Sequence, residues 1–269
     1  MNHKLIFSLS LFVICLIGCK KADNDGIVST FDKNLQGKAM LKINTASVFA
    51  NNPGMRIKIN DILVSDVITA RTPYPGGGYN TGGNSLGTYL SVPAGDVKVS
   101  LMIPYRKGGT IADTLKWAQD SISLFNTNIN VTSGKYYTLH ITDTVVNNFK
   151  SKLFEESLAL PTDTLPYFKF VNLMPNVSAV DLYFGPTLVA TNIKYLESSP
   201  EFTVDLSQTS TAWTVRQTGL PQTAPALATY TSTGTLTRGR KYTAFAMGYV
   251  GLAGTTEPRR PFISFYFVR

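Results

Sequence analysis

The feature that most restricts the fold is a regular alternation of apolar and polar residues along several short segments. Residues 55–60, 97–103, 180–184 and 202–206 place apolar side chains at every second position. A period of two is typical of a strand with one buried face, because successive strand side chains point to opposite faces of the sheet. The segment 262–268 is apolar at nearly every position, which indicates a strand that is central in its sheet or covered on both faces. No segment offers a long helical period, so the sequence predicts an all-β protein.

The first residues resemble a bacterial lipoprotein signal peptide. An uncharged apolar run, Leu5 to Ile17, has the length of a signal-peptide core and is too short to span a bilayer. The run ends in Leu16-Ile17-Gly18-Cys19, which resembles the lipobox, where the cysteine is acylated and becomes the new N-terminus. We therefore expect residues 1–18 to be removed, Cys19 to carry the lipid, and residues 19–37 to form a flexible tether.

The cysteine content agrees with this interpretation. The chain has two cysteines, Cys15 in the segment expected to be removed and Cys19 at the lipid attachment point. The exported body would hold no disulfide, so burial of its core must stabilise it. The expected location is the outer membrane, to which the lipid anchors the chain, with the periplasmic and external faces both left open.

The net charge and the distribution of basic residues give little information about the class of partner. The formal net charge is +8, a surplus that can favour anionic partners. The basic residues occur in small separated groups, at 20–21, 238–241 and 259–260. Such a scatter is typical of solvated surface, and an exported chain rarely meets nucleic acid, so we expect no nucleic-acid partner.

An internal repeat divides the body into two domains. Residues 131–138 and 236–243 share the pattern apolar, Thr, any, Gly, basic, any, Tyr, Thr, and the segments ending in Asn44 and Asn172 resemble each other. Each copy has the size of an immunoglobulin-like β-sandwich. We therefore predict two tandem sandwiches with the following bounds: domain 1 at residues 38–150 with a Gly-rich insertion at 72–87, a linker at 151–166, and domain 2 at 167–269.

The second copy resembles a known family. Its segments Tyr167–Pro175, Ala179–Gly185 and Gly239–Thr243 are similar to those of the domain of unknown function 4397 (DUF4397) family. The first copy lacks the Ser-Pro-Asp stretch and the Val-Asp-Val-Tyr strand of that family. The resemblance implies an exported β-sandwich lipoprotein of the type common in Bacteroidota, with no established chemistry.

Residues that could carry catalysis or metal binding are few. After removal of residues 1–18 the chain has one histidine, His140, and no free thiol, so we expect no metal, no cofactor and no catalytic residue. His140 falls on the strand face opposite Tyr137, Leu139 and Ile141, which predicts an outward, solvated side chain. The carboxylate pairs Glu155/Glu156 and Glu197/Glu201 are likewise expected to be solvated.

The Gly-rich insertion offers the one candidate ligand contact. It lacks the Gly-Lys-Ser/Thr ending of a phosphate loop. Tyr74 and Tyr79 could instead stack on a sugar ring or on a partner surface.

Three functions remain open from the sequence. The preferred hypothesis is a membrane-anchored, non-catalytic binding module whose ligand is a glycan or an envelope protein. The alternatives are a structural subunit of a fimbria-like surface assembly and, ranked last, a hydrolase whose two carboxylates meet only in the folded chain.

Overall fold

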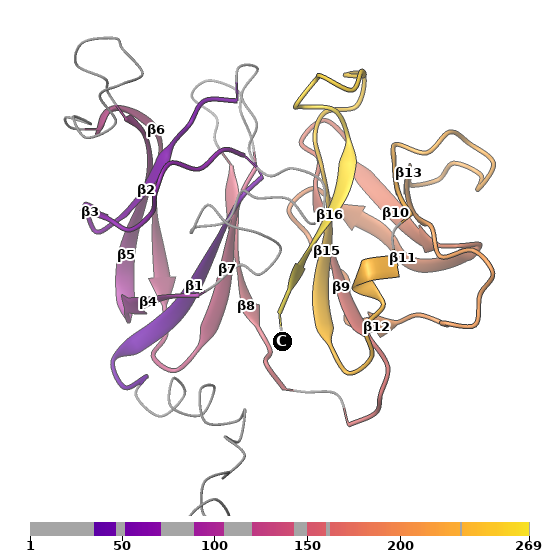
Figure 1. Cartoon of the computed structure of the whole chain (residues 1–269), viewed down its shortest axis with the longest axis horizontal. Helices are drawn as coiled ribbons and strands as arrows, with labels where there is room; N and C mark the ends of the chain where they lie inside the picture. The colour runs from indigo at the N-terminus through magenta and orange to yellow at the C-terminus, as the bar shows by residue number, and fades with distance from the viewer. Residues whose placement is uncertain are drawn as a thin grey trace, which may run out of the picture. The chain divides into compact units, whose positions relative to one another are not determined.

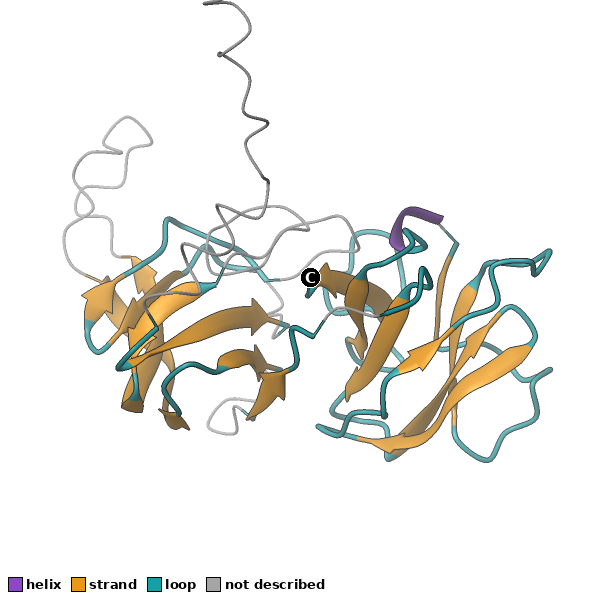
Figure 2. Cartoon of the chain, turned by 90° about the horizontal axis from the view of Figure 1, so that it is seen from below, coloured by secondary structure: helices purple, strands orange, loops and turns teal. Residues whose placement is uncertain are grey.

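The regular secondary structure of the described residues consists almost entirely of strands. A computed structural model describes residues 35–46, 52–70, 89–104, 120–142, 150–159, 162–231 and 233–268. It divides the chain into residues 1–37 and one compact unit, Lys38–Arg269. Apart from a single 3-10 turn, η1 (Thr233–Thr235), the regular elements of the described residues are strands in four sheets (Figures 1 and 2). The predicted all-β, sandwich-like fold is confirmed.

The first half of the unit, residues 38–156, contributes two sheets of four strands each. One has the order β4-β1-β7-β8 and the other β3-β2-β5-β6. The strands of half 1 are β1 (Lys38–Thr45), β2 (Arg56–Ile59), β3 (Ile62–Leu63), β4 (Leu90–Pro93), β5 (Gly95–Pro104), β6 (Asp120–Val131), β7 (Tyr136–Ile141) and β8 (Ser151–Glu156).

The second half, residues 167–268, repeats this plan. Its sheets have the orders β12-β9-β15-β16 and β11-β10-β13-β14. The strands of half 2 are β9 (Tyr167–Leu173), β10 (Ala179–Phe184), β11 (Thr187–Lys194), β12 (Phe202–Thr203), β13 (Trp213–Gln217), β14 (Ala228–Tyr230), β15 (Lys241–Met247) and β16 (Phe262–Phe267).

Each strand of half 1 therefore has its counterpart eight strands later. Both halves share a parallel pair at the centre of one sheet, β1 with β7 and β9 with β15. The turn before β7 contains Gly134 and the turn before β15 contains Gly239, with φ of 78° and 67°. Only glycine adopts this conformation without strain, which explains its place in the repeated motif. The predicted duplication thus extends to strand order. The finer immunoglobulin-like topology stays a prediction.

The register corrects one correspondence drawn from the sequence. Asn44 lies opposite His140, whereas Asn172 lies opposite Ala246, the counterpart of Ile141. Asn172 therefore corresponds to Thr45, one position later than the motif suggested. Asn172 faces the core of half 2, where its Nδ2 donates to the Ile193 carbonyl over 3.0 Å, while Asn44 faces the other side of its sheet. A shift of one residue reverses the face of a strand side chain.

The predicted linker is shorter than expected. Residues 151–156 of the predicted 151–166 segment form β8, which pairs with β7 along its whole length. Its alternation was hard to recognise because β8 buries Leu153 partly against the core of half 1 and Phe154 partly against the other face.

Each half has a separate apolar core. The core of half 1 is mainly aliphatic and includes Leu41, Ile57 and Val99, whereas the core of half 2 is rich in aromatic rings around Trp213. Strand β16 lies at the edge of its sheet, not at its centre, and is buried on both faces, so the second of the two predicted alternatives, a covered strand, is the correct one. Its Phe265 enters the core of half 2 and its Tyr266 enters a third cluster, described next.

Candidate functional site

The third cluster joins the two halves. It lies between the sheet β4-β1-β7-β8 of half 1 and the sheet β12-β9-β15-β16 of half 2, on the face of each sheet that points away from its own core. Its buried apolar members are Ala46, Ala70, Val171, Leu173, Phe245, Met247, Phe262 and Tyr266. A hydrogen bond from Thr142 Oγ1 to the Leu173 carbonyl, 2.7 Å, ties the ends of β7 and β9 together. The two halves therefore share a buried contact surface in addition to their own cores.

A chain of polar side chains crosses this surface, and we call it the interface network. Its members are Lys42, Asn44, His140 and Glu156 from half 1 and Lys169 and Tyr266 from half 2. Tyr266 Oη donates to Glu156 Oε1 over 2.7 Å, and Lys169 Nζ donates to Glu156 Oε2 over 2.6 Å. Glu156 is thus bonded on both carboxylate oxygens by the opposite half.

His140 completes the network from β7. Asn44 Nδ2 lies 2.8 Å from Nδ1, which therefore accepts, and Nε2 lies 3.3 Å from Tyr266 Oη. Burial, reinforced by Lys169 and Lys42, lowers the pKa of His140 from 6.5 to about 3. The ring is neutral at physiological pH and carries its proton on Nε2.

The structure corrects the expected surroundings of His140. The ring lies on the face opposite Tyr137, Leu139 and Ile141, as predicted, but it is fully buried rather than solvated. The cover comes from half 2, since Phe245 and Tyr266 place their rings 5.9 and 5.8 Å from the imidazole centroid.

Lys42, on β1, is fully buried near His140 of the neighbouring strand β7. Its Nζ donates to the Phe267 carbonyl over 3.0 Å and lies 4.3 Å and 4.6 Å from the ring centroids of Tyr89 and Tyr266. Burial lowers the pKa of Lys42 from 10.5 to about 7, partly offset by Glu156. Burial and the same carboxylate raise the pKa of both tyrosines. Both aromatic faces and the carbonyl therefore compensate a cation held out of water.

The two adjacent glutamates have opposite environments. Glu155 pairs with Lys135 over 2.6 Å with both side chains 52% exposed, in line with the prediction. The Glu156 side chain is 2% exposed, so the solvated position expected for it is wrong. Adjacent strand residues point to opposite faces, and the Glu156 face is the one that half 2 covers.

Equivalent residues of the two halves contact each other across the interface. By strand register His140 corresponds to Phe245, and these two rings touch. Lys42 lies over Tyr266, while its counterpart Lys169 lies over Phe154, the counterpart of Tyr266, at 5.8 Å. Reciprocal contacts of this kind are those of an isologous dimer. The halves thus pack like two subunits related by an approximate two-fold axis.

The polar groups of the network are distributed unequally over this pseudo-symmetric contact. The counterparts of Asn44, His140 and Glu156 in half 2 are apolar: they are Val171, Phe245 and Val268. Half 1 thus supplies polar groups at three positions where half 2 shows that an apolar side chain fits the same fold.

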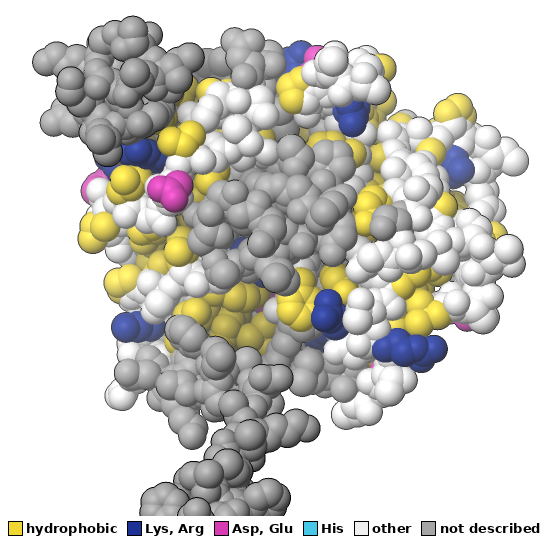
Figure 3. Space-filling model, viewed as in Figure 1, with side chains coloured by type: hydrophobic (Ala, Val, Ile, Leu, Met, Phe, Trp, Pro, Cys, Tyr) yellow, Lys and Arg dark blue, Asp and Glu magenta, His cyan; other side chains and the backbone are white. Residues whose placement is uncertain are grey.

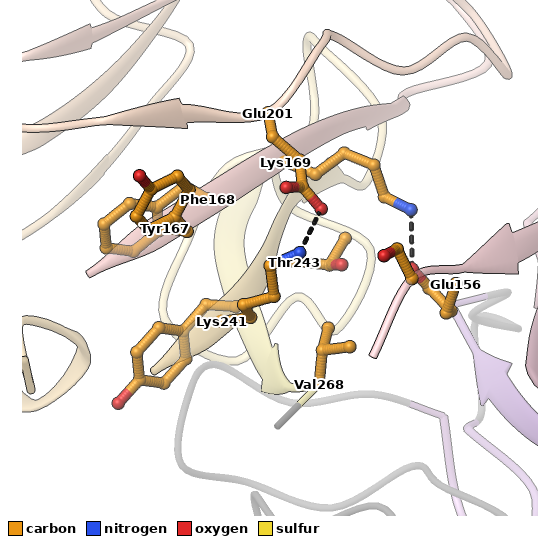
Figure 4. A pocket seen from close by; sticks show the side chains of 10 residues that line it. Glu156, Tyr167, Phe168, Lys169, Glu201, Lys241, Thr243 and Val268 are labelled. Carbon is orange, nitrogen blue, oxygen red and sulfur yellow. Dashed lines mark hydrogen bonds and ion pairs between the residues drawn. The ribbon is translucent and has the colours of Figure 1, made fainter. Parts of the chain in front are cut away.

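A small hollow opens beside the network at the start of β9 and β15. Two ion pairs flank Thr243 there, Lys169 with Glu156 and Lys241 with Glu201, the second at 2.8 Å (Figure 4). The space open to the centre of a water molecule is about 10 Å³, enough for about one water. Each ammonium group of the hollow already has its own carboxylate, so the charges there balance.

The residues proposed from sequence as attachment or ligand sites are not among those that the structure describes. Cys19, Tyr74, Tyr79 and the whole 72–87 insertion lie outside the described residues. In the part of the chain that the structure describes, no cluster of three His, Cys, Asp or Glu side chains could hold a metal. The same part contains no helix of the length and hydropathy needed to cross a bilayer. Lys and Arg side chains are scattered over the face shown in Figure 3.

A comparison with known families matches part of the chain. Residues 79–183 match the family model described as domain of unknown function (DUF4397). The chain carries a DUF4397 domain. The match extends from the residues before β4 to β10, so it includes His140, Glu156 and Lys169 and joins the two halves of the duplication. Among curated proteins, none matches the chain.

Proposed function

We propose that this DUF4397 protein is an envelope lipoprotein, of the type common in Bacteroidota, whose two halves form one non-catalytic interaction module. The observation that carries the proposal is the mutual pairing of the interface network. Glu156 is bonded by Tyr266 and Lys169, and His140 by Asn44 and Tyr266. These groups fix one half against the other, which is a structural task, and a fixed pair of sandwiches is a rigid scaffold for binding.

The outer edges of the sandwiches favour a protein partner. Strand β3, at the edge of its sheet, has Ile62 and Leu63 exposed by 69% and 44%. The corresponding edge strand β11 exposes Leu188 by 47%. Exposed apolar side chains grouped at the edge of a sheet form a contact surface for another protein chain. The proposed partner is therefore an envelope protein that contacts the exposed side chains of Ile62 and Leu63 on β3.

Crosslinking tests the partner surface. A photoreactive phenylalanine analogue at Ile62 should give a discrete adduct on intact cells, while the same analogue at Leu220, exposed by 46% in a turn of half 2, should give none. Protease treatment of the intact cells should remove the adduct if the module faces outward. Equal crosslinking patterns from both positions, or none from Ile62, would reject the β3 surface.

Anchoring depends on a separate feature, the expected lipid on Cys19. We expect Cys19→Ser to move the protein from the detergent phase to the aqueous phase in detergent-phase separation. The reason is that two or three acyl chains contribute about 0.8 kcal/mol for each buried methylene. Cys15→Ser is the matched control, because that residue lies inside the segment expected to be removed, and it should leave partitioning unchanged. A Cys19→Ser protein that stays with membranes would refute the anchor.

A further inference from the structure

The halves of the unit are separable in principle, because each has its own core. The clusters around Trp213 in half 2 and around Leu41 in half 1 share no residue with the interface cluster. Local opening of a contact surface between two packed units costs less free energy than global unfolding. The interface can therefore open while both sandwiches persist.

The interface carries more cations than anions. The titratable groups around His140 are Lys42 on β1, Lys152 and Glu156 on β8, Lys169 on β9, Tyr266 on β16 and Tyr89 before β4. Lys152 is exposed at the rim, and Lys241 of β15 is already paired with Glu201. Among these described groups Glu156 is the single carboxylate, and it interacts with the ammonium groups of both Lys42 and Lys169.

A proton on His140 would worsen this imbalance. It would add a charge in a fully buried position between Lys42 and Lys169. The new hydrogen on Nδ1 would also point at the Asn44 amide, which donates to that atom in the neutral state. Burial of an unpaired charge is among the most costly changes in a protein interior.

We propose that the interface network is an acid-sensitive latch, which holds the halves together near neutral pH and releases them in acid when His140 takes up a proton. Each half keeps its own fold in the released state. The faces of β1, β7, β9 and β15 that are buried in the interface then become exposed to solvent.

The titration of His140 sets the direction and the pH window. In the closed state burial, with Lys169 and Lys42, holds the pKa of His140 at about 3, and in the released state the ring returns to its ordinary value of about 6.5. Between these values the released state binds one more proton, so the closed state loses stability as the pH falls. The ratio of closed to released protein should drop about tenfold per pH unit in this window.

Titration of Lys42 also makes the closed state less stable as the pH falls, but in a higher pH range. The pKa of Lys42 is about 7 when closed and about 10.5 when released, and burial is the main cause. Between these values the released state again binds one more proton, so the latch tightens as the pH rises from 7 to 10.5.

Small-angle X-ray scattering of the lipid-free Cys19→Ser chain tests the latch. We expect a compact particle at pH 7.5 and a larger radius of gyration at pH 4, with unchanged far-ultraviolet circular dichroism. Between pH 6.5 and 4.5 the ratio of closed to released protein should fall about 50-fold.

Two variants isolate the role of the imidazole. His140→Phe copies its counterpart Phe245, and His140→Gln keeps a neutral hydrogen-bonding group if the larger ring does not fit. Either should remain compact at pH 4. The latch would be overturned if the parent stays compact at pH 4, if both variants open as the parent does, or if compactness and strand content are lost together.

Discussion

Replacing Glu156 by Gln is expected to lower the free energy of unfolding by about 3–5 kcal/mol, the usual loss when one member of a buried charged pair is removed. The Glu156 side chain is 2% exposed and receives hydrogen bonds from Tyr266 and Lys169. The amide keeps the size of the side chain but removes the negative charge that faces Lys169 and Lys42. Lys169, whose side chain is 17% exposed, would then lose its counter-charge, as would Lys42 to the extent that it is protonated near its pKa of about 7. Urea denaturation at pH 7.5, followed by circular dichroism, measures the loss.

The neighbouring residue supplies the control for this experiment. Glu155→Gln removes the same charge from an ion pair whose side chains are both 52% exposed. Solvent screens such a pair, so its loss should change the free energy of unfolding far less than the loss of Glu156 does. Equal losses for the two variants would contradict the assignment of Glu156 as the anion of a buried network.

A second comparison separates the contribution of the network to the free energy of unfolding from its role in switching. Asn44→Val, His140→Phe and Glu156→Val together copy the half 2 face onto half 1, although Lys42 and Lys169 would then lack a partner carboxylate. Extending the set with Lys42→Met and Lys169→Met removes those charges as well. Buried ionic networks replaced in full by apolar groups are often neutral or stabilising. The presence of polar groups at positions where apolar side chains fit thus favours a role in switching over one in stability.

The sequence predicted the strands well because alternation reports directly which side chains share a face. It placed Val180, Leu182 and Phe184 in a core and placed His140 opposite Leu139, and all four positions are confirmed. Alternation does not report what covers the second face. His140 was expected to be solvated because a polar strand face usually meets water, and the Tyr266 ring that covers it lies 126 positions away in the chain.

One feature of the sequence did indicate that a second strand face is buried. The segment 262–268 is apolar on both faces, and such a strand needs an apolar neighbour on each side. Its second face, with Phe262 and Tyr266, meets half 1. What the sequence lacked was the partner face, because half 1 contributes polar groups there. The network was therefore missed for a physical reason, since its polar side chains find their partners only in the assembled pair of halves.

Truncation of Trp213 to Ala is expected to have an effect as large as loss of Glu156, but within one half. Trp213 is fully buried on β13 with ring centroids of Phe168, Phe184 and Phe265 at 4.7, 4.8 and 5.6 Å. Removal of a buried tryptophan leaves a large cavity and typically costs about 3–5 kcal/mol. For a chain of this size the melting temperature should fall by roughly 10 °C, which calorimetry measures.

Trp213→Phe separates the cavity from the hydrogen-bonding capacity of the indole. Among the described residues Nε1 of Trp213 has no hydrogen-bond partner, so its removal breaks no bond. Phenylalanine restores most of the buried ring and should recover at least half of the stability lost in Trp213→Ala. Because Trp213 touches the core of half 2 and not the interface cluster, both variants should leave the response of His140 to acid unchanged in the folded protein. A shift of that response in Trp213→Phe would show that the cores and the interface are coupled, and that the halves do not open as independent units.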